Sequence, residues 1–398
     1  MLQRLEQKLL RRKKLGSLRT IDLAPAPLAG NSHTHQERVD FSSNDYLGLA
    51  RSRPLFSRIE EDYARYVRAS APCEPVLGAT GSRLLTGNNR LHHETECIIA
   101  DFHKQPVALL ANSGWDLNFG MLTSVVDTDT FVIYDELSHN SLLMGIRAGK
   151  AGSTAFRHND MEALRRQLEA SRDRPEKLVV VEAVYSMDGD IAPIQTVLDL
   201  AAEFGAHVLV DEAHSTGMLG ARGEGLVVSQ GLQGHSALLG CVHTFGKALG
   251  QHGAVLVTPH ASLKQFLVNY CSPLIYSTAM PISSLVAVQA SYAFCADSSA
   301  ERQNLQSLIA HFRKQAVQLD LPTLESNTAI QGVLVPGNAA VLEASKQLQS
   351  LGLGCLPIRA PTVAAGTERI RVVLHAHNTE QQVDLLCSSI ARILQNNA

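Results

Sequence analysis

Short apolar runs alternate with helical patterns from about residue 50 to residue 280, and this alternation limits the folds open to the chain. Apolar strands separated by helices are typical of a mainly parallel sheet that is covered by helices on both faces. Residues 161–171 and 194–204 have helical periodicity. The candidate strands are residues 107–110, 131–134, 178–183, 207–210, 238–242 and 254–257. We therefore predict an α/β fold with a large domain built on a mainly parallel sheet.

The two ends of the chain have other patterns. A chain of 398 residues exceeds the usual size of one core, so a smaller companion domain is expected. A helix is predicted over residues 281–294, with Pro281 in its first turn, and helical residues 339–351 lie between strand-like residues 331–335 and 369–374. We predict three parts, which are an N-terminal helix and arm (1–50), a large domain (51–285) and a small α+β domain (286–398) that combines with the arm.

Composition excludes several classes of protein. A net charge of -3 with 18% charged residues is ordinary for a globular protein and argues against a nucleic-acid binder, and no apolar run reaches membrane-spanning length. The 7 cysteines are scattered without a C-x-x-C pair, so we expect reduced thiols in a cytoplasmic protein, with neither disulfides nor a zinc site. The basic, leucine-spaced start of the chain favours an amphipathic helix, while organelle import stays open.

Lys247 and Asp211 are the most informative pair of residues. Asp211 directly follows one predicted strand, and Lys247 lies among small residues shortly after the next one. A lysine amine can form a Schiff base with the aldehyde of pyridoxal phosphate (PLP), and a carboxylate can keep the pyridine nitrogen of PLP protonated. Alone, a strand-end Asp is often a helix cap and a lone Lys is usually a surface charge. Together and in this order, the two residues favour PLP chemistry.

Further polar residues follow other predicted strands and would reach the same sheet edge. Ser113, Gly114 and Trp115 precede a predicted helix whose N-terminus could hold a phosphate, although a simple capping turn is the alternative. Three further hydroxyls, those of Thr244, Ser277 and Thr278, could complete a phosphate site. The alternative is that they only cap helices.

His139, Ser186 and His214 are the remaining candidates near a PLP ring. A His139 ring could stack on the pyridine, and the alternative is a hydrogen-bonded structural histidine. Ser186 could reach the phenolic oxygen of the cofactor, while the Asp188-Gly189 pair after it is also a turn signal. His214 is a candidate donor to that oxygen or to a reacting carbonyl.

Arg359 precedes a strand of the small domain and could clamp a substrate carboxylate, although a surface Arg is the default. The glycine-spaced segment 78–87 has no G-x-G-x-x-G register, and we do not interpret it as a nucleotide loop. The paired histidines lack the cysteine or carboxylate spacing of a metal site, so no metal is expected.

Taken together, the motifs resemble the α-oxoamine synthases, PLP enzymes of fold type I. The resemblance runs from about Leu2 to the C-terminus. It rests on Phe41-Ser-Ser-Asn-Asp-Tyr-Leu-Gly-Leu49, Ser186-Met-Asp-Gly-Asp190, Asp211-Glu-Ala-His-Ser-Thr-Gly217, Thr244-Phe-Gly-Lys247 and Ile275-Tyr-Ser-Thr278, which match the family pattern in order. Within the family, residues 358–367 are most like members that join L-alanine to a pimeloyl thioester carried on coenzyme A or a carrier protein.

The resemblance implies a seven-stranded sheet, PLP as cofactor, and a decarboxylating acyltransferase that works as a homodimer. It implies roles for several residues. Lys247 would be the Schiff-base lysine, Asp211 would pair with the pyridinium nitrogen, and His139 would stack on the ring. The phenolic oxygen would have Ser186 and His214 as neighbours. The phosphate would be bound by Ser113, Gly114, Trp115 and Thr244, and the second subunit would contribute Ser277 and Thr278. By the same resemblance Asn44, Arg359, Thr362 and Arg19 would meet the substrate.

The chain departs from the family pattern at Ala79, Ala360 and Ala364, and residues 71–75 look like an insertion. These departures bear on the acyl specificity. The alternatives are a sibling enzyme that uses glycine or serine with another acyl thioester, an aminotransferase, and a binding protein on a degenerate PLP fold.

Overall fold

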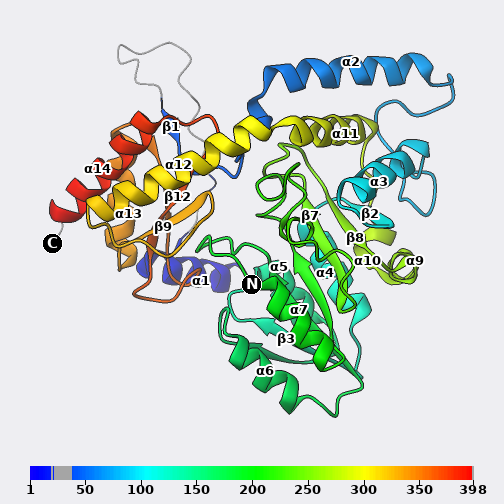
Figure 1. Ribbon diagram of the computed structural model, residues 1–398, viewed down its shortest axis with the longest axis horizontal. Coiled ribbons are helices and arrows are strands. Elements are labelled where there is room, and N and C mark those ends of the chain that lie inside the picture. Colours follow the sequence, from blue (N-terminus) through cyan, green and yellow to red (C-terminus); the bar gives the residue numbers. More distant parts are fainter. Residues whose placement is uncertain (19–20, 22–37, 397–398) are drawn as a thin grey trace. The chain divides into compact units, whose positions relative to one another are not determined.

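The computed structural model describes residues 1–18, 21 and 38–396, which divide into two compact units (Figure 1). Unit 2 contains residues 45–185 and 191–302, and unit 1 contains residues 1–44, 186–190 and 303–398. Arg19, one of the predicted substrate residues, lies outside the described residues. The sequence-based domain boundaries near residues 50 and 285 stay a prediction.

Unit 2 is built on a seven-stranded sheet, counted over the described residues. Its order is β2-β8-β7-β6-β5-β3-β4, and β8 runs antiparallel to both of its neighbours. The strands are β2 (Val107–Ala111), β3 (Thr130–Asp135), β4 (Gly152–Phe156), β5 (Glu176–Glu182), β6 (His207–Asp211), β7 (Leu238–Thr244) and β8 (Ala254–Thr258). The predicted α/β class and mainly parallel sheet are thus confirmed, while the edge strand β4 was not predicted.

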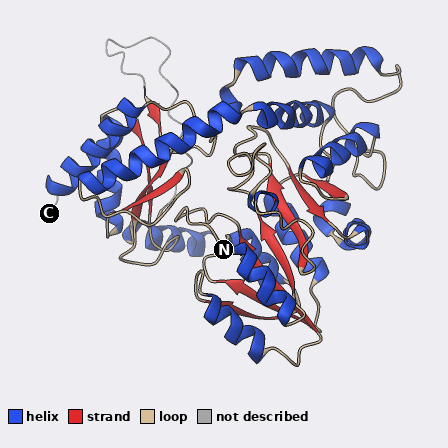
Figure 2. Cartoon of the chain, viewed as in Figure 1, coloured by secondary structure: helices blue, strands red, loops and turns tan. Residues whose placement is uncertain are grey.

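Helices accompany the sheet of unit 2 (Figure 2). They are η1 (Leu49–Arg51), α2 (Arg53–Ala69), α3 (Arg90–Phe102), α4 (Gly114–Val125), α5 (Asn140–Ala148), α6 (Met161–Ala170), α7 (Ile194–Glu203), α8 (Leu226–Ser229), α9 (Ala261–Tyr270), α10 (Ser272–Ile275) and α11 (Ile282–Asp297). Apolar side chains of α4 and α5 pack with those of the central strands, as Met121, Leu142 and Val180 do, each fully shielded from solvent. This burial of apolar surface is the main stabilising contribution to the layer that carries the strand ends.

Unit 1 holds smaller sheets with helices. One is three-stranded, in the order β11-β12-β9, and antiparallel, and β1 pairs with β10 in parallel. The elements are α1 (Leu2–Lys14), β1 (Val39–Asp40), α12 (Ser299–Gln318, which begins in unit 2), β9 (Ile330–Leu334), α13 (Asn338–Ser350), β10 (Leu353–Gly354), β11 (Leu356–Ile358), β12 (Arg369–Val373) and α14 (Glu380–Asn396). The predicted N-terminal helix and the predicted strand-helix-strand pattern are confirmed. Among the described residues, no helix has the length and apolar character needed to cross a membrane.

Candidate active site

Unit 2 contains a cavity of about 180 Å³ at the carboxyl ends of its parallel strands. This is the edge at which open α/β sheets bind ligands. The cavity brings together seven of the predicted site residues and three polar residues that the sequence interpretation had given no role. Its lining consists of Gly114, Trp115, Asn118, His139, Ser141, Glu182, Asp211, Ala213, His214, Val242, Thr244 and Lys247.

Asp211 is the last residue of β6 and is 5% exposed. Its Oδ2 accepts a hydrogen bond from Asn118 Nδ2 at 2.7 Å, and its Oδ1 accepts one from the backbone N–H of Ala213 at 2.9 Å. A buried carboxylate is costly unless hydrogen bonds and a positive partner compensate for the lost hydration. The two donors fix the carboxyl plane, and a protonated ring nitrogen in the cavity would supply the positive charge.

His139 lies just before α5 and is its N-cap. Its Nδ1 accepts from the backbone N–H of Ser141 at 3.2 Å, and its own backbone N–H donates to Glu182 Oε1 at 2.5 Å. His139 is exposed in the single chain, yet nearby atoms remove enough water from the ring to lower its pKa. The Asp211 carboxylate opposes this shift, and the Lys247 ammonium adds to it. The hydrogen bond from the backbone N–H of Ser141 fixes the ring at the cavity, and the lowered pKa favours its neutral form.

Glu182 ends β5 and stands directly beside Asp211 in the parallel register. Burial raises the pKa of Glu182 well above its ordinary value, and the negative charge of Asp211 raises it further. Two neighbouring carboxyls in a site poor in water avoid ionising together. The raised pKa favours a proton on Glu182, while the Asp211 carboxyl is fixed by its two donors in a position to hold a cation.

His214 lies beyond the end of β6, and its ring is buried. Its Nδ1 is 2.5 Å from the hydroxyl oxygen of Tyr46, which has no exposed surface. Tyr46 lies within a family motif quoted above, but its contact with His214 could not be foreseen from the sequence.

The N-terminus of α4 and the turn after β7 form another part of the cavity. Ser113 Oγ accepts from the backbone N–H of Asp116 at 3.0 Å, so this hydroxyl caps the helix. Gly114 lacks a side chain where an added Cβ would lie 3.7 Å from Thr244 Cβ. The space beside a helix N-terminus suits a phosphate, because backbone N–H groups and the helix dipole favour an anion.

Ser277 and Thr278 do not line this cavity but a smaller one in the same unit. The carbonyl oxygen of Thr278 accepts from Asn112 Nδ2 at 2.9 Å, and Ser82 and Thr278 form an antiparallel bridge. Residues 78–87, the glycine-spaced segment, thus support the chain around Thr278.

The predicted substrate residues that are described belong to unit 1. There Arg371 donates to the carbonyl oxygen of Ser186 at 2.7 Å and to Asn44 Oδ1 at 3.0 Å, so it holds two predicted residues together. Arg371 was missed by the sequence interpretation because it sits within an apolar strand. Arg359 Nη1 donates to the carbonyl oxygen of Gly16 at 2.6 Å, and Thr362 donates its backbone N–H to the carbonyl oxygen of Arg359 at 2.8 Å.

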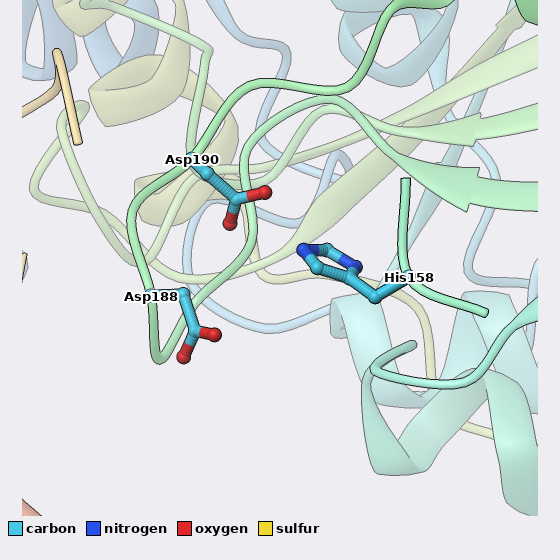
Figure 3. Close-up of side chains that lie close together, drawn as sticks. All are labelled: His158, Asp188 and Asp190. Carbon is cyan, nitrogen blue, oxygen red and sulfur yellow. The ribbon is translucent and has the colours of Figure 1, made fainter. Parts of the chain in front are cut away.

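The loop of residues 186–190 carries Asp188 and Asp190, whose side chains are drawn in Figure 3. Asp188 forms an ion pair with Arg369, and Gly189 has a φ of 79°, a value that favours glycine. An added Cβ at Gly189 would lie 2.1 Å from the carbonyl oxygen of Ile330. The Asp-Gly turn signal is therefore explained by close packing within unit 1.

Comparisons with known proteins agree with this site. Residues 36–390 match the family model described as aminotransferase class I and II. The 8-amino-7-oxononanoate synthase of Emericella nidulans is 37% identical over 376 residues, covering 90% of this chain and 89% of the relative. The enzyme of that name from Paraburkholderia phymatum is 37% identical over 355 residues and covers 87% of each chain. A solved serine palmitoyltransferase from S. paucimobilis with PLP bound has a TM-score of 0.87 at 27% identity, covering 100% of this chain and 98% of that one.

The groups in the cavity fit PLP. They offer an amine for its aldehyde, a carboxylate fixed by hydrogen bonds for its ring nitrogen, an imidazole beside its ring, and a helix N-terminus for its phosphate. The family model covers nearly the whole chain, and the relatives are similar over most of their length. The chain belongs to the aminotransferase class I and II family, within its PLP-dependent α-oxoamine synthase branch.

Proposed function

We propose that the chain condenses L-alanine with a pimeloyl thioester, giving 8-amino-7-oxononanoate, carbon dioxide and the free thiol, a step of biotin biosynthesis. The observation that carries this proposal is the presence of Lys247, Asp211 and His139 in one cavity of a chain that is 37% identical to relatives named for that synthesis. The donor would be pimeloyl-CoA or a pimeloyl carrier protein.

When bound, PLP accepts the electrons that are released as the amino acid loses its α-proton and its carboxylate. Lys247 would hold the cofactor covalently and, once displaced by alanine, would take the α-proton on its amine. Asp211 would keep the ring nitrogen protonated, and His139 would cover the ring and keep water from it.

The Tyr46–His214 pair would act on the acyl donor. The His214 ring, oriented by the Tyr46 hydroxyl, would donate to the thioester carbonyl oxygen and stabilise the negative charge that develops there. The thiol then leaves, and the carboxylate of the new β-keto acid is lost as carbon dioxide.

The proposal extends to a homodimer. Ser277 and Thr278 line a different cavity from Lys247, which supports their serving the site of a second subunit. Asn44, Arg359, Thr362 and Arg19 remain the proposed substrate residues, and Ser186 and Ser113 keep their proposed roles near the cofactor.

Free-thiol release tests the function. The purified, PLP-loaded chain is given pimeloyl-CoA with L-alanine, glycine or L-serine in parallel, and the products are identified by mass spectrometry. Alanine-dependent release with a product of the mass of 8-amino-7-oxononanoate supports the proposal. Release with glycine or serine alone would transfer the chain to a sibling activity, and a keto-acid-dependent reaction without thiol release would make it an aminotransferase.

A further inference from the structure

A continuous set of hydrogen bonds joins Asp211 to His139 through two side chains for which the proposed chemistry has no role. Asn118 Nδ2 donates to Asp211 Oδ2 at 2.7 Å and lies 3.0 Å from Ser141 Oγ. Ser141 Oγ in turn lies 2.8 Å from His139 Nδ1. Asn118 and Ser141 are 2% and 1% exposed, so water does not compete for these bonds.

The direction of each hydrogen bond follows from the chemistry of the donors. The backbone N–H of Ser141 can only donate, and it points to His139 Nδ1 at 3.2 Å. Nδ1 must therefore carry a lone pair, and the Ser141 hydroxyl that also faces it must be a donor too. The lone pairs of Ser141 Oγ are then left to accept the Asn118 amide proton.

The same directions decide where the proton of His139 sits. A neutral imidazole carries one proton, and with Nδ1 as acceptor that proton is on Nε2. A second proton on Nδ1 would face two donors at the N-terminus of α5, where the helix dipole also disfavours a cation. The charged groups that face the ring are Asp211 and Lys247, with Glu182 against its backbone N–H.

We propose that Asn118 and Ser141 are positioning residues that hold His139 as a neutral imidazole with its proton on Nε2 while they fix the Asp211 carboxylate. An imidazolium at His139 would attract the Asp211 charge and weaken the hold of Asp211 on the cofactor nitrogen. The neutral ring leaves that charge to the cofactor. This inference rests on the proposed function for its purpose, whereas the protonation state itself can be observed without any substrate.

The test is ¹⁵N NMR of the histidine rings in the PLP-loaded, full-length chain. A His139→Phe variant assigns the signals of that ring. We expect the wild-type signals to show a proton on Nε2 and a bare Nδ1. In Ser141→Ala the backbone N–H still faces Nδ1, so we expect Nδ1 to stay unprotonated while its signal shifts on the loss of the hydroxyl donor. We also expect a Kd for PLP raised about 3- to 10-fold, the range for one net hydrogen bond. Asn118→Leu, which keeps the size but removes both donors, should raise the Kd about tenfold or more.

Ser138→Ala is the matched control. Ser138 is also a buried serine near His139, but its hydroxyl has no hydrogen-bond partner among the described residues, so its loss should alter neither the NMR signals nor the Kd. A wild-type ring with a proton on Nδ1, or with both nitrogens protonated, would overturn the inference. So would Ser141→Ala signals and a Kd equal to those of the wild type. A wild-type ring protonated on Nε2 in a chain that releases no thiol would refute the proposed function alone.

Discussion

At the scale of the residue, Glu182 and Asp211 illustrate how neighbouring strands set charge. They are paired in register on β5 and β6, and burial followed by the charge of Asp211 raises the pKa of Glu182 well above its ordinary 4.5. A raised pKa means that the folded chain binds a proton at Glu182 more tightly than the unfolded chain does. The free energy of unfolding contributed by this group is fully present below pH 4.5 and is lost as the pH rises through the raised pKa.

A Glu182→Gln variant should remove this pH-dependent loss of the free energy of unfolding. Glutamine keeps an oxygen to accept from the His139 N–H but cannot ionise, so we expect the free energy of unfolding to fall less between pH 5 and pH 9 than in the wild type. Urea unfolding at several pH values measures it. Glu176→Gln, at the exposed start of the same strand, is the control and should follow the wild type. Equal pH slopes for wild type and Glu182→Gln would contradict the neutral-acid assignment.

Lys247 supplies a second prediction at this scale. Its amine lies in the same cavity as Asp211 and His139, and it is the lysine proposed to hold the cofactor. We expect Lys247→Ala to lose at least about 10³-fold in turnover, because it loses both the covalent hold and the proton-transferring base. Borohydride reduction makes the link between PLP and a lysine permanent, and mass spectrometry of the intact chain then detects it. We expect PLP fixed to the wild type and to the control Lys150→Ala, which alters an exposed lysine, and none fixed to Lys247→Ala. Cofactor fixed at full yield in the variant would refute the role.

Some site residues could be predicted from the sequence and others could not, for a physical reason. Lys247 and His139 follow strands and Asp211 ends one, where small and turn-forming neighbours mark an unusual polar position. Asn118 and Ser141 lie within helices, where an amide or hydroxyl is ordinary, and only the packing of α4 against α5 reveals their contact. The one available signal for Asn118 was its place four residues after Gly114, on the same face of a helix.

At the scale of the element, a strand could be predicted from the sequence where most of its side chains are buried. The strands β5, β6 and β8 are buried along nearly their whole length and read as apolar runs, which is the pattern of a central strand. The sequence of β4 is Gly-Ser-Thr-Ala-Phe, and most of its residues are exposed. An edge strand of this kind buries too little to leave a periodic signal, so only its pairing with β3 defines it.

Glu96 of α3 ties several elements of unit 2 together. Its carboxylate accepts from Arg83, from Lys264 of α9 at 2.7 Å, and from the backbone N–H of Leu110 in β2 at 3.1 Å. Burial favours a higher pKa for Glu96, but the two cations hold that pKa below its ordinary 4.5. The stabilisation is therefore present above pH 4.5 and is lost as the pH falls through the lowered pKa.

Glu96→Gln should destabilise the chain by about 3 kcal/mol at pH 7, since it leaves partly buried cations without their counter-charge. The cost should shrink as the pH falls below 4.5. Urea unfolding measures both effects. The control is Glu94→Gln on the same helix, where the partner Arg90 is 83% exposed and the expected change is within about 0.5 kcal/mol. A cost for Glu96→Gln no larger than that of the control would show that the cluster does not hold these elements.

At the scale of the whole molecule, fold class and cofactor could be predicted because they depend on the order of strands and on the residues that end them. The assembly of subunits depends on contacts between two chains, and the order of strands in one chain does not predict it. Unit 2 exposes large apolar side chains at Leu77, which precedes the glycine-spaced segment, at Leu85 within it, and at Tyr276, which precedes Ser277 and Thr278. Exposed apolar side chains that gather in such segments are typical of subunit contacts, which agrees with the proposed homodimer.

Mixed dimers test whether Ser277 and Thr278 serve the partner's site. One chain carries Lys247→Ala, and the other carries Ser277→Ala with Thr278→Val; each homodimer should be nearly inactive, since every site lacks either its lysine or its two hydroxyls. In the mixed dimer, the site with an intact Lys247 receives Ser277 and Thr278 from the Lys247→Ala chain. That site is complete, so the purified mixed dimer should recover about half of the wild-type thiol release. If the hydroxyls instead served the site of their own chain, both sites of the mixed dimer would be defective, and activity would stay at the level of the two homodimers.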